Sequence, residues 1–224
     1  MSARQGAAQS HPGTPGPSRR ERGFQIQSRV RGDRGLRLLV GGGGTAGHVY
    51  PALSVVHALT ERATHHASPA PEIHFAHGPS RIDSEVLAHA GIARTRIAAA
   101  PMRGVGPHGA VWGAARLVGA VSQSWRLIGS FRPDVVLVTG GYVSAPVLVA
   151  ARLRGIPSVA FLPDIVPGFA MRAMAPFATR VALGFAASQA HWNPAHAVVT
   201  GYPVRPEFLL ADRERGRKIG RAHV

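Results

Sequence analysis

GGGGTAGH, residues 41–48, is a glycine-rich turn between an apolar run, Leu36–Val40, and a second run, Val49–Leu59, that has the spacing of a helix. Glycine adopts positive φ angles at little cost and lets a ligand approach the backbone closely. A helix that starts after such a turn directs its unpaired N–H groups and the positive end of its dipole towards the same place. This first glycine turn (residues 41–48) therefore predicts a phosphate-binding site with His48 at its mouth.

The rest of the chain alternates short β-branched runs with helical stretches. The strand-like runs are apolar throughout, so we expect helices to cover both faces of the sheet. Repeated β-α units predict an α/β fold, a Rossmann-like doubly wound parallel sheet with right-handed connections. The expected strands are Leu36–Val40, Glu72–His77, Arg94–Ala98, Asp134–Val138, Ser158–Leu162, Arg180–Gly184 and Ala197–Thr200. The expected helices are Tyr50–Arg62, Arg81–His89, Gly109–Ser130, Ala145–Arg154 and Gly168–Phe177.

The formal net charge of +15 is concentrated at the two ends of the chain. Eight arginines lie at or before Arg37, and five arginines and Lys218 lie at or after Arg205. Between them twelve arginines face six acidic residues, so the middle is only mildly basic and no nucleic-acid partner is expected. Residues 1–35, rich in Gly, Pro, Ser, Gln and Arg, are expected to form a disordered basic tail. Such a tail suits an anionic membrane surface; an unselected extension from an upstream start codon is the open alternative.

The composition excludes several other classes of protein. Hydrophobic residues make up 45% of the chain and charged residues 17%, which is enough for a substantial core. There is no cysteine, and the twelve histidines lack paired ligand spacing, so neither a disulfide scaffold nor a metal or other cofactor is expected. No apolar stretch has the length of a membrane span.

A nicotinamide cofactor is disfavoured by the residues after the second strand. Gly42-x-Gly44-x-x-Gly47 formally matches the dinucleotide fingerprint. That fingerprint also needs an acidic residue after the second strand to bind the ribose hydroxyls. Here residues 77–81 read HGPSR, without a carboxylate. The Walker pattern fails too, because the turn is not succeeded by Gly-Lys-Ser/Thr.

A second glycine turn, TGGYVSAP at residues 139–146, comes after the strand expected at Asp134–Val138. The carboxyl ends of parallel strands lie at one edge of a sheet, so we expect the two turns to converge on one crevice. A single turn of this kind is often only a tight connection between a strand and a helix. Two of them, with His48 and Tyr142 beside them, predict a ligand site.

Three ordered motifs resemble the MurG family of glycosyltransferases. They are GTAGHxxPAL at residues 44–53, GGYVSxP at residues 140–146, and GYPVR at residues 201–205, which is similar to that family's Gly-Asn-Pro-Val-Arg. The resemblance runs from about residue 36 to about residue 209. These enzymes move N-acetylglucosamine from UDP to the lipid-linked muramyl-pentapeptide precursor of peptidoglycan.

The resemblance implies a GT-B glycosyltransferase, with residues 36–209 as the Rossmann-like N-terminal domain that binds a lipid-linked diphosphate acceptor. It also implies an inverting, metal-independent transfer by a peripheral protein at the cytoplasmic face of the cell membrane. His48 is the candidate base or a diphosphate contact, since a neutral imidazole suits proton removal; helix capping without a chemical role is the alternative. Arg205 would reach the UDP-sugar donor at the domain junction. The implied substrate-binding residues are Gly44, Thr45, Ala46, Gly47, Gly140, Gly141, Tyr142, Ser144 and Arg205.

One departure from the family motifs concerns the acceptor. Where the family has His-Glu-Gln-Asn after the fifth strand, this chain has FLPD at residues 161–164. The carboxylate of Asp164 would repel a phosphate, but it suits a sugar hydroxyl or a catalytic base. Ala46, in place of a usual glycine, is a smaller change. A related glycosyltransferase that acts on another lipid acceptor is therefore the first alternative.

The end of the chain leads to a further expectation. Lys218 is the only lysine, and it opens the heptad KIGRAHV at residues 218–224, which we interpret as foreign to a chain that otherwise uses arginine. Residues 210–224 are then a truncated linker. The C-terminal donor-binding domain of the family is expected to follow Arg205 and to be missing, so this chain is expected to be inactive alone. A non-catalytic, membrane-recruiting subunit of a split glycosyltransferase is the second alternative.

Overall fold

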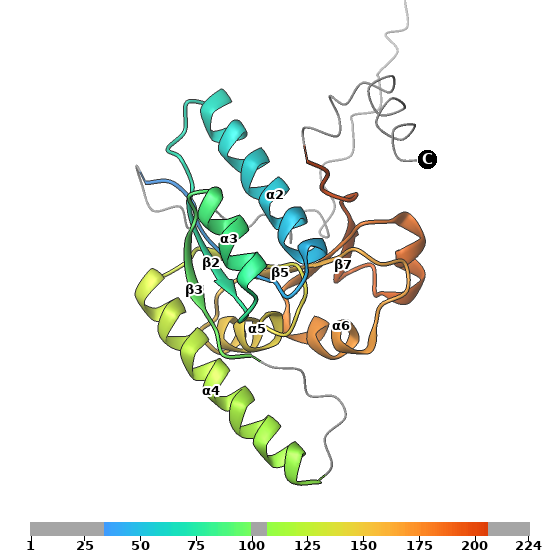
Figure 1. Cartoon of the computed structure of the whole chain (residues 1–224). Coiled ribbons are helices and arrows are strands. Elements are labelled where there is room, and N and C mark those ends of the chain that lie inside the picture. The colour runs from blue at the N-terminus through green and yellow to red at the C-terminus, as the bar shows by residue number, and fades with distance from the viewer. Residues whose placement is uncertain (1–33, 100–106, 206–224) are drawn as a thin grey trace, which may run out of the picture. The chain divides into compact units, whose positions relative to one another are not determined.

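The computed structural model describes residues 34–99 and 107–205, so the basic tail and the linker expected at residues 210–224 lie almost wholly outside it. Seven parallel strands form one sheet in the order β3-β2-β1-β4-β5-β6-β7 (Figure 1), which confirms the expected α/β, doubly wound parallel fold. The strands are β1 (Arg37–Gly41), β2 (Glu72–His77), β3 (Ala93–Arg96), β4 (Val135–Val138), β5 (Ser158–Leu162), β6 (Arg180–Leu183) and β7 (Ala197–Val199). The α-helices are α2 (Ala46–His65), α3 (Arg81–His89), α4 (Pro107–Phe131), α5 (Ser144–Leu153) and α6 (Phe169–Met174), with 3₁₀ turns η1 (Ala175–Phe177) and η2 (Ala186–His191).

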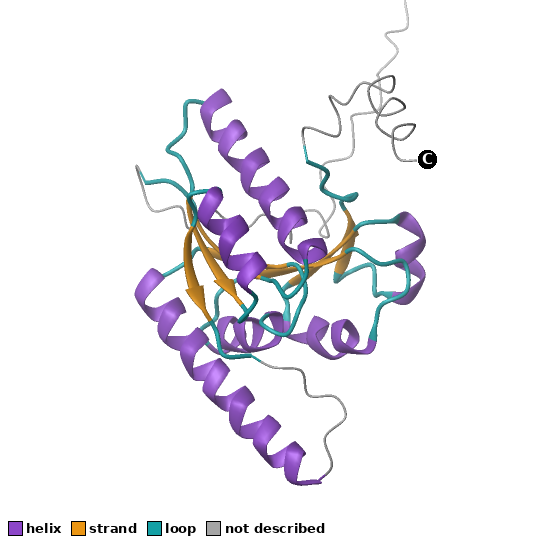
Figure 2. Cartoon of the chain, viewed as in Figure 1, coloured by secondary structure: helices purple, strands orange, loops and turns teal. Residues whose placement is uncertain are grey.

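Helices cover both faces of the sheet. Figure 2 shows α2 and α3 on one face and α4, α5 and α6 on the other. In β1, Leu38 and Val40 pack in the cluster that contains Val49 of α2 and Leu87 of α3. The residue between them, Leu39, packs in the opposite cluster, which α4 and α5 supply. This two-sided burial explains why the strand is apolar throughout.

Most expected elements agree with the structure, and three differ for local reasons. The helix expected at Tyr50–Arg62 begins at Ala46, because the last residues of the glycine turn already form its first turn. The helix expected at Gly168–Phe177 divides into α6 and η1, where Pro176 cannot donate to a continuing helix. The turn η2 was not expected, since such short 3₁₀ segments have no hydrophobic period of their own.

The amino ends of β1 and β4 are joined by one carboxylate. Asp134 accepts two hydrogen bonds from the Arg34 guanidinium, at 2.7 and 3.1 Å, and one from the backbone N–H of Arg37, at 2.9 Å. Its side chain is 13% exposed, so these bonds are made largely away from water. Asp134 therefore links the first strand to its neighbour at the edge of the sheet opposite the glycine turns.

Replacing this carboxylate tests that link. We expect Asp134→Ala to lower the free energy of unfolding by about 1–2 kcal/mol, because the Arg37 N–H loses its partner in a half-buried position. The control is Glu72→Gln, which breaks the Arg37–Glu72 ion pair but at a side chain that is 58% exposed. That variant should change stability by less than about 0.5 kcal/mol. Urea denaturation measures both, and equal losses would contradict this role of Asp134.

Candidate functional site

The two glycine turns come after neighbouring strands at the point where the strand order reverses. Strand β1 pairs with β2 on one side and with β4 on the other, and Gly41 lies opposite Val138 in the register. In doubly wound sheets ligands bind outside the carboxyl ends of the strands at such a reversal. The convergence expected from the sequence is therefore found in the structure.

The backbones of the two turns lie in direct contact. A Cβ atom on Gly141 would overlap the carbonyl oxygen of Gly43, and one on Gly140 would overlap the His48 ring. The φ angles of Gly140 and Gly141 are +120° and +81°, a region that residues with side chains rarely occupy. These two glycines therefore let the turns pack against each other.

The His48 ring is oriented by polar atoms of its own turn. Its Nδ1 lies 3.1 Å from the Thr45 hydroxyl and 3.3 Å from the carbonyl oxygen of Gly43. Because a carbonyl only accepts, this arrangement favours the tautomer with the proton on Nδ1. The Nε2 atom then carries a lone pair, which is the form that a general base needs. The Thr139 hydroxyl also donates to the backbone carbonyl of His48, at 2.6 Å, and so ties the two turns together.

The start of α2 is open to an anion. Thr45 occupies the N-cap position but makes no capping hydrogen bond with its side chain, and the first turn contains no acidic residue. Ala46 and Gly47, the first two helical residues, therefore direct their N–H groups outwards from the positive end of a helix of 20 residues. An uncapped helix start of this kind can bind an anion, and the phosphate site expected here stays a prediction.

In the second turn, one side chain supports the backbone and another faces solvent. The Ser144 hydroxyl is buried; it accepts from the N–H of Gly140 at 3.1 Å and donates to the Gly140 carbonyl at 2.8 Å. Tyr142 is 56% exposed beside it. The structure thus places Ser144 as a support of the turn and Tyr142 as the side chain accessible to a ligand.

Arg205 lies over the N-terminal part of α2. Its guanidinium stacks on the Tyr50 ring, 4.2 Å from the centroid. A cavity of about 220 Å³ lies between this part of α2 and the GYPVR segment; its lining residues are Gly47, Tyr50, Pro51, Ser54, Tyr202, Pro203, Val204 and Arg205. The third motif is therefore brought to the helix that carries the first.

Among the residues that the structure describes, Asp164 makes no polar contact with these groups. It is exposed after the end of β5, where its backbone carbonyl accepts a hydrogen bond from the Ser188 hydroxyl at 3.1 Å. In the described part of the chain, no hydrogen bond or ion pair joins its carboxylate to either glycine turn. The role of Asp164 as a catalytic base therefore stays a prediction.

Two departures from the family motifs contact each other. The ring of Phe161, which stands in the FLPD segment, meets the ring of Tyr202, which stands in the GYPVR segment, at a centroid distance of 5.7 Å. Phe185 adds a third ring at 6.5 Å from Tyr202. Phe161 and Tyr202 thus form an aromatic contact at positions where the family motifs have polar residues, and Phe161 is buried in the core.

A buried carboxylate that the sequence analysis missed lies under the first glycine turn. The Gly44 N–H donates to Oδ2 of Asp83 at 2.5 Å, and the Asp83 side chain is 1% exposed. The dinucleotide fingerprint has its acidic residue directly after the second strand, whereas Asp83 stands in the first turn of α3. The pattern Ser80-x-x-Asp83, in which the Ser80 hydroxyl accepts from the Asp83 N–H, is the signal that could have drawn attention to it.

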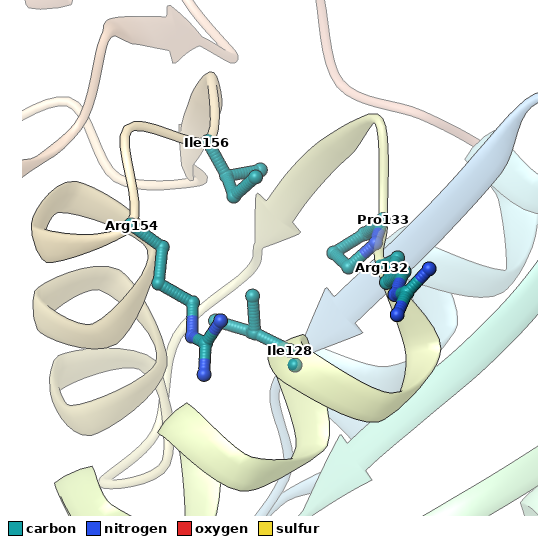
Figure 3. A pocket seen from close by; sticks show the side chains of 6 residues that line it. Ile128, Arg132, Pro133, Arg154 and Ile156 are labelled. Carbon is teal, nitrogen blue, oxygen red and sulfur yellow. The ribbon is translucent and has the colours of Figure 1, made fainter. Parts of the chain in front are cut away.

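A second cavity, of about 480 Å³, lies at the opposite edge of the sheet (Figure 3). Its lining residues are Ile128, Gly129, Arg132, Pro133, Arg154 and Ile156, from the ends of α4 and α5. The Arg154 guanidinium stacks 4.0 Å above the Trp125 ring, and so connects the two helices. This cavity is remote from the glycine turns, because it lies at the amino ends of β4 and β5.

Residues 38–183 match the glycosyltransferase family 28 N-terminal domain. A UDP-N-acetylglucosamine–N-acetylmuramyl-(pentapeptide) pyrophosphoryl-undecaprenol N-acetylglucosamine transferase of Symbiobacterium thermophilum is 37% identical over 184 residues, which are 82% of this chain and 48% of that protein. The enzyme of the same name from Salinibacter ruber is 38% identical over 185 residues, with the same two coverages. The chain thus spans about half the length of these curated relatives.

Solved structures share the fold. MurG of Acinetobacter baumannii superimposes with a TM-score of 0.62 at 24% identity, over 76% of this chain and 46% of that chain. A UDP-GlcNAc 2-epimerase of Neisseria meningitidis, bound to UDP-GlcNAc, superimposes with a TM-score of 0.55 at 13% identity, over 84% of this chain and 53% of that chain. The same arrangement of strands and helices therefore occurs in proteins with different activities.

The contact between the two turns can be tested with one methyl group. Gly141→Ala should lower the free energy of unfolding by about 1–3 kcal/mol, because the new Cβ meets the Gly43 carbonyl at a strained φ. The control is Gly155→Ala, which has a similar φ of +65° but nothing within 4 Å of the added atom. It should cost about 1 kcal/mol or less. Thermal and urea denaturation of both variants measure the difference; equal losses would contradict the close contact.

Two histidines of β2 make stability depend on pH. Burial lowers the pKa of His77, and the charges of Arg94 and Arg96 lower it further against the opposing effects of the Gly78 backbone and Asp83. Burial also lowers the pKa of His74, against the effect of Glu72. The unfolded chain therefore binds more protons below about pH 6.5, so this part of the stability is complete above that pH and is lost as the pH falls below it.

We expect the free energy of unfolding to be smaller at about pH 5 than at about pH 7.5, and the difference to shrink in His77→Asn. The same replacement at the exposed His65 should leave the difference unchanged. Urea denaturation at both pH values provides the measurement. An equal pH dependence in the wild type and in His77→Asn would exclude a contribution from this histidine.

Proposed function

Because this chain belongs to glycosyltransferase family 28, we propose that it is the acceptor-binding half of a MurG-like enzyme that transfers N-acetylglucosamine from UDP-GlcNAc to a lipid-linked diphosphate acceptor. The observation that supports this best is the pair of packed glycine turns with His48 between them, at the reversal point of the sheet. The acceptor named for the relatives carries a pyrophosphoryl group on undecaprenol, which suits the open start of α2.

The proposed reaction uses His48 as the general base. Its Nε2 takes the proton of the acceptor hydroxyl, whose oxygen then attacks the anomeric carbon of the sugar. The bond from that carbon to the UDP oxygen breaks, and UDP leaves with the electron pair, so that the configuration inverts. Arg205 contacts the donor beside α2, and Tyr142 contacts the acceptor from the second turn.

The diphosphate of the acceptor binds to the N–H groups at the start of α2. Thr45 orients His48, while Gly140 and Gly141 keep the second turn close enough to share the ligand. The other donor-binding residues would come from the half of the relatives that this chain does not cover. On this proposal the chain requires a second half for turnover.

A lipid-linked acceptor implies work at a membrane surface. None of the helices in the described residues is long and apolar enough to cross a bilayer. We propose peripheral attachment at the cytoplasmic face of the cell membrane, where a UDP-sugar and a lipid-linked acceptor meet.

A second candidate keeps the reaction and changes the acceptor. In the family motifs, polar residues stand at the positions of Phe161, Tyr202 and Asp164. Here Phe161 and Tyr202 form an aromatic contact, and Asp164 has an exposed carboxylate. A different sugar or lipid head group over this edge would account for both changes. Comparing binding of the muramyl-pentapeptide lipid with binding of other undecaprenyl-diphosphate sugars distinguishes the two candidates.

The proposed role of His48 is tested by turnover. In the chain joined to the donor-binding half of the S. thermophilum relative, we expect His48→Ala to lower kcat by about 100-fold or more, with KM for UDP-GlcNAc nearly unchanged. The control is His57→Ala on the same helix, which removes only an exposed pair with Glu61. Full turnover of His48→Ala would exclude the base. Absence of binding between this chain and vesicles that carry the lipid-linked acceptor would contradict the proposed function itself.

A further inference from the structure

The carboxylate of Asp83 holds one end of the first glycine turn. Its Oδ2 accepts a hydrogen bond from the N–H of Gly44 at 2.5 Å. A Cβ on Gly43 would come within 2.5 Å of the same oxygen, so the turn fits closely around the carboxylate. The Gly44 N–H is thereby directed inwards, away from a ligand above the turn.

The charge of this carboxylate is not neutralised by a neighbouring cation. Among the described residues, no arginine, lysine or histidine forms an ion pair with Asp83, and its Oδ1 is buried without a hydrogen-bond partner. The nearby His77 does not compensate for it, because burial lowers the pKa of that imidazole. A buried negative charge therefore lies beneath Gly43 and Gly44, where a second anion would be repelled.

The other end of the same turn has the opposite character. From Thr45 onwards the chain presents the uncapped N–H groups of Ala46 and Gly47 and the positive end of the α2 dipole. Two or three residues thus separate a part of the turn that disfavours anions from a part that favours them.

We propose that Asp83 is a positioning residue that makes one end of the first glycine turn unfavourable for anions. A diphosphate then binds at Ala46 and Gly47, while an uncharged group, such as a sugar hydroxyl, lies over Gly43 and Gly44. The proposal deepens the proposed function and rests on the acceptor role of this edge of the sheet. Under this proposal the acceptor lies across the turn with its diphosphate at the start of α2 and its sugar over Gly43 and Gly44.

The test uses the isotope-labelled chain and inorganic pyrophosphate as the probe. In the wild type, pyrophosphate should shift the amide resonances of Ala46 and Gly47 and leave those of Gly43 and Gly44 nearly unchanged. Asp83→Asn keeps an oxygen that can accept from Gly44 but removes the charge. It should bind pyrophosphate about three- to tenfold more tightly, with the shifts spreading to Gly43 and Gly44.

Two further variants separate position from charge. Glu85→Gln removes the same charge from an exposed site on α3, so its pyrophosphate affinity should stay within about twofold of the wild type. Asp83→Ala removes the acceptor of Gly44, whose amide should then exchange with solvent about tenfold faster or more, whereas Asp83→Asn should retain the protection.

Any of three results would overturn the proposal. The first is that pyrophosphate fails to bind the wild type, or shifts the resonances of Gly43 and Gly44 as strongly as those of Ala46 and Gly47. The second is that Asp83→Asn binds pyrophosphate no more tightly than Glu85→Gln does. The third is that the exchange rate of the Gly44 amide is unchanged in Asp83→Ala. None of these readouts needs turnover. Loss of glycosyl transfer with the expected pyrophosphate pattern would count against the proposed function alone.

Discussion

The rest of the site depends on how closely two backbone turns approach each other. Because β1 and β4 are direct neighbours, the turns at their carboxyl ends meet with no room for a side chain at Gly140 or Gly141. This contact places the His48 ring against one turn while its Nδ1 is held by the other. The pairing of β1 with β4 thus sets the distance between the turns, and the glycines allow the turns to come this close. The position of the imidazole therefore depends on strand pairing.

The sequence was sufficient for the fold because its signals were local and repeated. Short β-branched runs with turn residues between them located the strands, and the two glycine turns predicted where a ligand would bind. What it could not provide were contacts between residues far apart in the chain. Asp83 lies 39 residues from Gly44, and the contact of Phe161 with Tyr202 joins segments at the ends of two different strands. No spacing rule relates such pairs, since the path of the chain between them decides whether they meet.

The shared fold does not by itself determine the reaction. A similar sheet occurs in a UDP-GlcNAc 2-epimerase, so the strands and helices are compatible with more than one activity. The features that bear on function in this chain are chemical details at the edge of the sheet. The tautomer favoured for His48, the uncapped start of α2 and the support that Ser144 gives to the second turn are properties of individual residues. Function therefore depends on these residues, and the fold supplies only their positions.

Strand β3 forms one edge of the sheet, and its composition bears on self-association. It is four residues long, Ala93–Arg96, and two of those four are arginines, Arg94 and Arg96, both exposed. An open strand edge invites pairing with the edge of another molecule, whereas a short strand with like charges repels a second copy of itself. These arginines therefore disfavour growth of the sheet by addition of a second molecule at this edge.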